Sequence, residues 1–140
     1  MSEEEKTFVE IESMLGRKFE PKRRCRWIVK IDGIDPFLAM KASRPRVLVT
    51  GAQKTYCWMN VELYDPIAPT GAGMIWEWLQ QNEPREVKLQ VLDPVGTIVE
   101  EWQISNATIA EADFGELSYA SAEPATIKVA LSYEKCELKF

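Results

Sequence analysis

The sequence contains no histidine among its 140 residues. Histidine is the commonest general base near neutral pH and the commonest metal ligand, so its absence excludes Ser-His-Asp and Cys-His catalysis and most zinc sites. The aspartates that could form a carboxylate pair lie beside glycine or proline or in predicted turns, where Asp favours its own backbone. They are Asp32, Asp35, Asp65, Asp93 and Asp113. We therefore expect no enzyme, no cofactor and no bound metal; a hydrolase that uses two carboxylates is a distant alternative.

Long apolar runs are also missing, because no segment approaches the roughly 20 residues that span a bilayer. The first residues, MSEEEKTF, are acidic where a signal peptide is basic. We expect a protein made in the cytosol, with no membrane partner. The net charge of −5 disfavours tight binding of nucleic acid, although an acidic surface lets a polyanion pass without adhering.

Only three cysteines occur, and none has the CxxC spacing of a metal site. Cys25 and Cys57 share the spacing of apolar strand residues, which favours buried thiols. A second hypothesis is an intersubunit disulfide between Cys25 and Cys136, because Cys25 lies among arginines that favour the thiolate and Cys136 lies in an expected exposed tail. A purely monomeric band from oxidised, assembled protein on non-reducing electrophoresis would remove this hypothesis.

The pattern that is present is a two-residue alternation of apolar side chains, typical of half-buried strands. It predicts a hairpin over residues 25–42, a strand over 45–50, a connection at 51–54 and a strand over 57–64. A second hairpin is predicted over 87–104 around the turn Asp93 to Gly96, and a last strand over 127–133. After residue 133 the alternation changes phase, so either a bulge shifts the face or the C-terminal tail packs elsewhere.

Two segments have helical spacing instead. Ser2 and Glu5 form a capping-box pattern that predicts a helix ending near Gly16. Thr70 is the expected N-cap of a short internal helix around residues 74–79. Gly71 and Gly73 lack the GK[ST] ending of a phosphate loop, so we interpret them as a flexible start to this helix.

These patterns together predict a mainly β protein. We expect an antiparallel β-sandwich or barrel-like domain over residues 21–140, with one short internal helix. A helical extension is expected over residues 1–20.

The basic segment at residues 22–26 allows two interpretations. It could bind nucleic acid, but an isolated basic patch on an acidic protein more often meets an acidic patch on a neighbouring subunit. Our candidate intersubunit contacts combine this patch with apolar residues of the two predicted helices. They are Arg23, Arg24, Arg26, Phe8, Ile11, Leu15 and Trp76.

Five stretches of the sequence resemble the tail tube proteins of contractile-tailed, myovirus-type bacteriophages. They cover most of the chain after the first twenty-odd residues and occur in a fairly specific order. The stretches are RWIVKIDGIDPFLAMKASRP (26–45), VELYDPIAP (61–69), MIWEWLQ (74–80), VKLQVLDPVGTIVEEWQISNA (87–107) and FGELSYASAEPATIKVALSY (114–133).

The resemblance implies a non-enzymatic subunit of a virion, assembled in the host cytoplasm. Such subunits form hexameric rings whose inner sheets join into one continuous barrel, and the rings stack into a tube within a contractile sheath. Implied partners are further copies of the chain, the tail sheath protein, and baseplate and tail terminator proteins; DNA passes through the lumen without specific binding. The alternative is a stand-alone β-barrel that binds a small ligand or single-stranded nucleic acid, which would be a monomer with a basic groove.

The sequence departs from this family in one place. The segment before Val61, which in relatives carries a longer hairpin that reaches the neighbouring ring, is shorter here. The N-terminal helix is expected to take over part of that contact.

Overall fold

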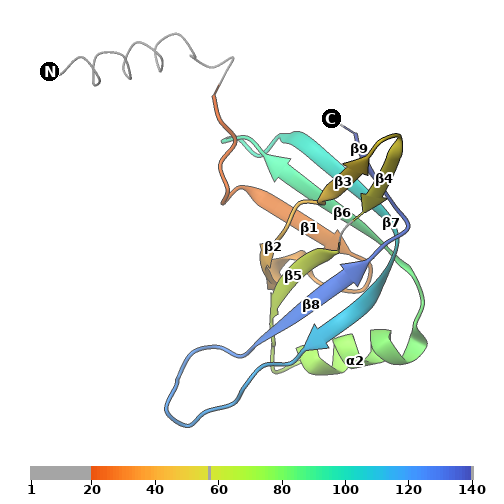
Figure 1. The fold of residues 1–140 in the computed structure, drawn as a ribbon. Coiled ribbons are helices and arrows are strands. Elements are labelled where there is room, and N and C mark those ends of the chain that lie inside the picture. Colours follow the sequence, from red (N-terminus) through yellow and green to blue (C-terminus); the bar gives the residue numbers. More distant parts are fainter. Residues whose placement is uncertain (1–19, 57, 140) are drawn as a thin grey trace, which may run out of the picture.

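The protein is described here by a computed structural model of residues 20–56 and 58–139. The elements follow one another as β1 (Trp27–Ile31), η1 (Pro36–Leu38, a 3-10 helix), β2 (Ala39–Ala42), β3 (Val47–Thr50), β4 (Gln53–Tyr56), β5 (Met59–Tyr64), α2 (Gly71–Gln81), β6 (Arg85–Leu92), β7 (Ile98–Asp113), β8 (Thr126–Ser132) and β9 (Lys135–Leu138) (Figure 1). Seven strands form one antiparallel sheet, in the order β1-β6-β7-β8-β5-β2 with β9 also paired to β7. The strands β3 and β4 form a separate hairpin.

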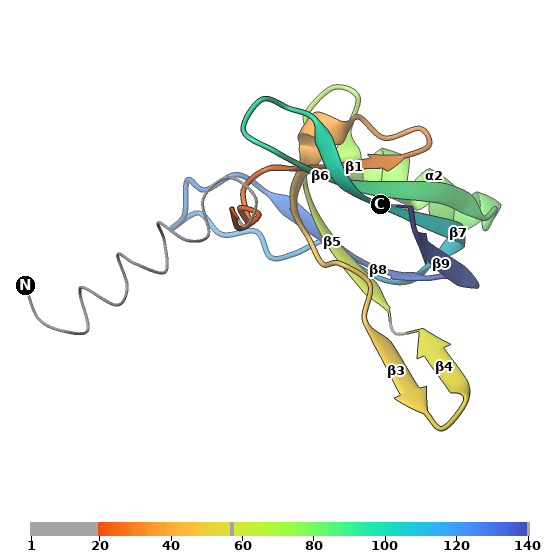
Figure 2. The ribbon, with the colours of Figure 1, turned by 90° about the horizontal axis from the view of Figure 1, so that it is seen from above.

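The long strand β7 divides the sheet into two halves. Its first part pairs with β6 and β9, and its second part pairs with β8. We call the first half sheet A (β1, β6, first part of β7, β9) and the second half sheet B (second part of β7, β8, β5, β2). Asn106, with a φ of 56°, lies where the partners change. The two halves form separate layers in Figure 2, which confirms the predicted antiparallel sandwich or partly open barrel.

The core lies between these two layers. The alternating apolar side chains of both sheets point inward, and α2 adds Ile75 and Trp78, which are almost completely buried. The strands contribute Val29, Ile31, Met59, Val61, Leu63, Val87, Leu89, Ile104, Ile127, Val129 and Leu131. Burial of such a set is the main favourable term in folding. The predicted strand periodicity therefore identifies the core.

The internal helix begins after Thr70, as predicted. The side chain of Thr70 accepts a hydrogen bond from the Gly73 N–H at 3.2 Å, and Asn82 ends the helix in a left-handed conformation. The role of Gly71 differs from our interpretation of it as flexible. A Cβ atom there would lie 2.8 Å from the Asp65 Oδ1 atom and 2.8 Å from the Pro66 ring, so close packing requires glycine.

The predicted hairpin over residues 25–42 is wrong. Strand β1 pairs with β6 in sheet A, whereas β2 pairs with β5 in sheet B. The reason is local, because Asp35 and Pro36 start a 3-10 helix in which the Asp35 carboxylate accepts from the Phe37 N–H at 2.9 Å. This turn redirects the chain from one layer to the other.

The segment at residues 51–54 is also more structured than predicted. Gln53 and Lys54 belong to β4, and the connection is only Gly51 and Ala52. Gly51 has a φ of +61°, which suits the first position of a two-residue hairpin turn.

The second predicted hairpin, over residues 87–104, is confirmed by the pairing of β6 with β7. Asp93 stabilises its turn by accepting hydrogen bonds from the N–H groups of Val95 and Thr97 at 3.0 and 2.8 Å. The phase change after residue 133 arises because the tail leaves β8 and pairs as β9 with the first part of β7. The tail therefore packs in sheet A, the second of the two possibilities.

The predicted N-terminal helix and the extension over residues 1–20 fall almost entirely outside the described residues. Within residues 20–56 and 58–139, no helix has the length and apolar character needed to cross a membrane.

Candidate assembly surfaces

Sheet B has an unpaired strand at each side. On one side β2 pairs only with β5, and on the other the second part of β7 pairs only with β8 among the described strands. Unpaired strand edges present free backbone donors and acceptors and are usually protected or joined to another chain. Helix α2 lies near the end of β7 in Figure 1, but within residues 20–56 and 58–139 no strand continues the ladder there. Both sides of sheet B can therefore accept a further strand.

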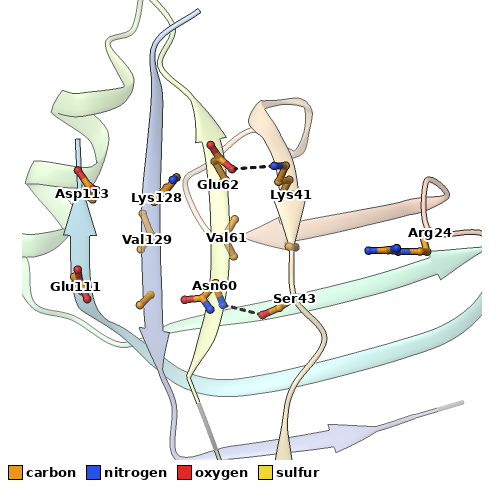
Figure 3. Close-up of a pocket in the computed structure, with 12 residues that line it drawn as sticks. Arg24, Lys41, Ser43, Asn60, Val61, Glu62, Glu111, Asp113, Lys128 and Val129 are labelled. Carbon is orange, nitrogen blue, oxygen red and sulfur yellow. Dashed lines mark hydrogen bonds and ion pairs between the residues drawn. The ribbon is translucent and has the colours of Figure 1, made fainter. Parts of the chain in front are cut away.

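The outer face of sheet B is charged and hollowed. A shallow hollow of about 560 Å³ extends over β2, β5, β8 and the end of β7 (Figure 3). Six charged side chains line it, three cationic and three anionic, so their charges balance. They are Arg24, Lys41, Lys128, Glu62, Glu111 and Asp113. Within the described residues no group of three or more acidic or cysteine side chains could hold a metal ion.

The hairpin of β3 and β4 projects from the body of the subunit (Figure 2). It carries exposed apolar side chains, with Leu48 47% exposed and Val49 65% exposed, and Trp58 follows it at 56%. Such residues on an isolated two-stranded hairpin gain nothing from the core, and contiguous exposed apolar surface marks an interaction site. The hairpin is therefore a candidate contact with another chain.

Exposed apolar side chains also occur at the opposite end of sheet B. The register places Tyr64 beside Thr126 at that end, whereas Met59, next to the hairpin, pairs with Leu131. The loop between β7 and β8 projects from this end in Figure 1. The connections at this end of sheet B carry four large exposed side chains, which are Phe37, Ile67, Leu117 and Tyr119.

The basic segment before β1 is partly neutralised within the subunit. Glu100 is buried, and its carboxylate accepts from the Lys22 Nζ atom at 2.6 Å, the Arg44 Nη1 atom at 3.1 Å and the Trp102 Nε1 atom at 2.7 Å. Burial alone would raise the pKa of Glu100. The hydrogen bonds from Lys22 and Trp102 and the charge of Arg44 outweigh it, so the pKa of Glu100 is below its ordinary value.

Glu100 was not among the residues predicted from sequence. Its position in the alternation of β7 is ordinary, and its partners lie 78 and 56 residues away along the chain. No local signal could have found it. Glu100 attaches two segments to sheet A. One is the N-terminal segment that carries Lys22, and the other is the connection from β2 to the projecting hairpin, which carries Arg44.

The structure places the predicted contact residues as follows. Arg23 and Arg24 are exposed and Arg26 is half-buried, and Trp76 is 56% exposed on the outer side of α2. Phe8, Ile11 and Leu15 lie outside the described residues. The role of these residues between subunits stays a prediction.

The two cysteines of the hypothetical disulfide differ in accessibility. Cys25 is exposed, contrary to the buried thiol that its spacing favoured. Cys136 is buried in β9, contrary to the expected exposed tail, and burial raises the pKa of its thiol. Cys57 lies outside the described residues. A disulfide between subunits stays a prediction, and it now requires Cys136 to become accessible.

Solved structures of contractile injection systems share this arrangement of sheets and helix. A chain of an extracellular contractile injection system, the PVC sheath-tube complex in its extended state, aligns with a TM-score of 0.66 and 15% identity over 91% of this chain and 97% of that chain. A chain of the anti-feeding prophage baseplate aligns with a TM-score of 0.62 and 16% identity, over 85% of this chain and 95% of that one. Hcp1 from Flavobacterium johnsoniae aligns with a TM-score of 0.61 and 14% identity, over 81% and 94%.

No protein-family model matches the sequence, and neither does any curated protein. The structural likeness is therefore one of fold. This chain has the fold of the Hcp and tail tube proteins of contractile injection systems, and these neighbours are structural tube proteins rather than enzymes. The resemblance to tail tube proteins drawn from the sequence is confirmed at the level of the fold.

Proposed function

We propose that this protein is the subunit of the inner tube of a contractile injection device, and that it assembles as stacked hexameric rings. The observation that carries the proposal is the pair of unpaired edges on sheet B, provided by β2 and the second part of β7. Sheet B consists of four antiparallel strands in the order β7, β8, β5 and β2. Its two edge strands, β7 and β2, therefore run in opposite directions. Copies arranged head to tail around an axis can therefore continue the antiparallel ladder, and closing the ring pairs both edges of sheet B.

Sheet B is the half that we assign to the lumen. Its outer face carries balanced charges, and the two valines among the lining residues, Val61 and Val129, are themselves buried in the core. A face without net charge does not bind a polyanion strongly. The projecting hairpin and the exposed apolar side chains at the opposite end of sheet B would then face adjacent rings, where stacking covers them.

The second part of the proposal concerns the kind of contractile particle to which the tube belongs. The sequence resemblance favours the tail of a contractile phage, with DNA as the cargo, whereas the structural neighbours reported above belong to other contractile systems. The fold is compatible with both. Proposed partners are a sheath protein, a baseplate and a tube terminator, and the proposed location is a tail assembled in the host cytoplasm. DNA protected from nuclease inside purified rods would support genome delivery, and rods without DNA would contradict it.

Negative-stain electron microscopy and sedimentation of the purified protein test the proposal. We expect rings or hollow rods with a central channel. A monodisperse monomer across the accessible concentration range would contradict it and would favour the stand-alone binding barrel. That alternative needs a free basic groove, yet two cations of the Lys22 to Arg44 region are bound to Glu100 within the subunit.

A further inference from the structure

A row of alternating charges crosses the outer face of sheet B. Asp113 on β7 is in register with Lys128 on β8, Lys128 with Glu62 on β5, and Glu62 with Lys41 on β2. Figure 3 shows these four side chains at one level of four neighbouring strands. The Lys41 Nζ atom lies 3.8 Å from the Glu62 Oε2 atom, and the Glu62 Oε1 atom also accepts from the Thr126 hydroxyl at 3.2 Å. We call Asp113, Lys128, Glu62 and Lys41 the charge row.

The two ends of the charge row carry opposite charges and lie on the two unpaired edges. Asp113 is anionic on the edge formed by β7, and Lys41 is cationic on the edge formed by β2. Both side chains are exposed, that of Lys41 to 75%. Opposite charges on directly facing strands stabilise a sheet, whereas like charges destabilise it. The row is therefore complementary to a second copy of itself.

We propose that the joint between neighbouring subunits has the register in which Lys41 lies opposite Asp113 of the next copy. This inference rests on the proposed function, since it requires β2 and β7 to meet in a ring. The alternation of negative and positive side chains then continues without interruption around the lumen. The same register brings Ser43, which follows β2 and continues its pairing with β5, opposite Glu111. The Ser43 hydroxyl can donate to that carboxylate.

Other registers lose this match. A slip of one residue places Lys41 opposite Ala112, whose side chain belongs to the other face of the sheet. A slip of two residues places Lys41 opposite Glu111 but leaves the Asp113 carboxylate opposite the Ala39 region without a cation. The charges thus specify the register, which is the usual role of complementary charges at an interface.

Disulfide cross-linking tests the register directly. Lys41→Cys and Asp113→Cys are introduced together, with Cys25→Ser to remove the exposed native thiol. Within one subunit the two edges are three strand spacings apart, roughly 14 Å, too far for a disulfide. Oxidation of assembled rings should therefore give a ladder of covalent oligomers up to the ring size on non-reducing gels. The two single-cysteine variants in the same background should not give this ladder.

Reversal of the charge row provides a second test that does not depend on cysteines. The variant with Lys41→Glu, Glu62→Lys, Lys128→Glu and Asp113→Lys has an unchanged net charge and an intact alternation. We expect this variant to assemble on its own, and the protein concentration at which its rings form should be within about threefold of that for the wild type. It should enter mixed rings with tagged wild-type protein roughly tenfold less often than wild-type protein does, because each mixed joint opposes like charges.

A variant with Lys88→Glu and Glu83→Lys, which exchanges charges outside sheet B, is the matched control and should mix freely. If the wild type forms rings, two results would overturn the proposed register while leaving the tube function intact: assembled rings of the double-cysteine variant that give no cross-linked ladder, and free mixing of the charge-reversed variant with wild-type protein. Failure of the wild-type protein to form rings at all would instead contradict the proposed function, and the register with it.

Discussion

At the scale of the residue, Glu100 shows how a buried charge is accommodated. A carboxylate removed from water is costly unless it is paired and hydrogen-bonded. Here two cations and an indole N–H provide that compensation. The cations themselves remain about half exposed, so they can be rehydrated if Glu100 is removed. The cluster therefore stabilises the attachment of two segments to sheet A, and its loss leaves no buried cation without a partner.

The substitution Glu100→Gln tests this cluster. It retains an acceptor for Trp102 but removes the charge, and we expect a loss of about 2 kcal/mol in the free energy of unfolding at pH 7. Because the pKa of Glu100 is lowered in the folded state, its contribution is complete above the pKa of the unfolded carboxyl. The contribution is lost as the pH falls through the lower folded-state pKa.

The measurement is denaturant unfolding between pH 3 and pH 7. The difference between wild type and variant should be constant above about pH 5 and shrink below roughly pH 4. Glu116→Gln, an exposed carboxylate in the loop after β7, is the control and should change the stability by less than about 0.5 kcal/mol. A difference for Glu100→Gln that does not depend on pH would show that charge is not what the cluster requires.

At the scale of the element, the projecting hairpin separates folding from assembly. Its apolar side chains are exposed in the subunit, so they contribute little to subunit stability. The resemblance drawn from the sequence predicted a shortened segment here and assigned part of its contact to the N-terminal helix. The structure shows a complete hairpin with a two-residue turn, so in the proposed tube this element could itself contact the adjacent ring.

The substitution Val49→Asp places a charge on the most exposed apolar residue of β3. We expect unfolding of the subunit to change by less than about 0.5 kcal/mol, because the side chain packs against little. Rod formation should fall by roughly tenfold or more, because a charge must be desolvated at the contact. Sedimentation and microscopy give the assembled fraction.

Val95→Asp is the matched control for this experiment, since Val95 is 84% exposed in the turn between β6 and β7. It introduces the same chemical change away from the hairpin and should leave rods unaffected. Normal rods from Val49→Asp would show that the hairpin does not contribute to stacking.

At the scale of the whole molecule, β7 joins the two layers because one strand contributes to both. Its pairing partners come from β6, β8 and β9, which lie before and after it in the chain. Sheet A and sheet B therefore cannot separate without breaking the same strand. The assembly edges of sheet B are supported by the core of the entire domain, which suits a rigid component of a tube.

The predicted N-terminal helix provides a test at the same scale. Deletion of residues 1–15 leaves Lys22 and its contact with Glu100 intact. We expect the melting temperature to change little and single rings to persist, while long rods become rare. Microscopy and thermal unfolding of the truncated protein measure the two effects separately. Rods of normal length after truncation would contradict a stacking role for this segment.

The sequence by itself determined the local structure, because strand periodicity, the Thr70 cap and the Asp93 turn depend on neighbouring residues. It also favoured a fold that the structural comparisons confirm. Only the tertiary structure decided that β1 and β2 belong to different layers, that Glu100 binds Lys22 and Arg44, and that the charge row has complementary ends. These features depend on which distant strands pair and in which register, and no short-range propensity contains that information.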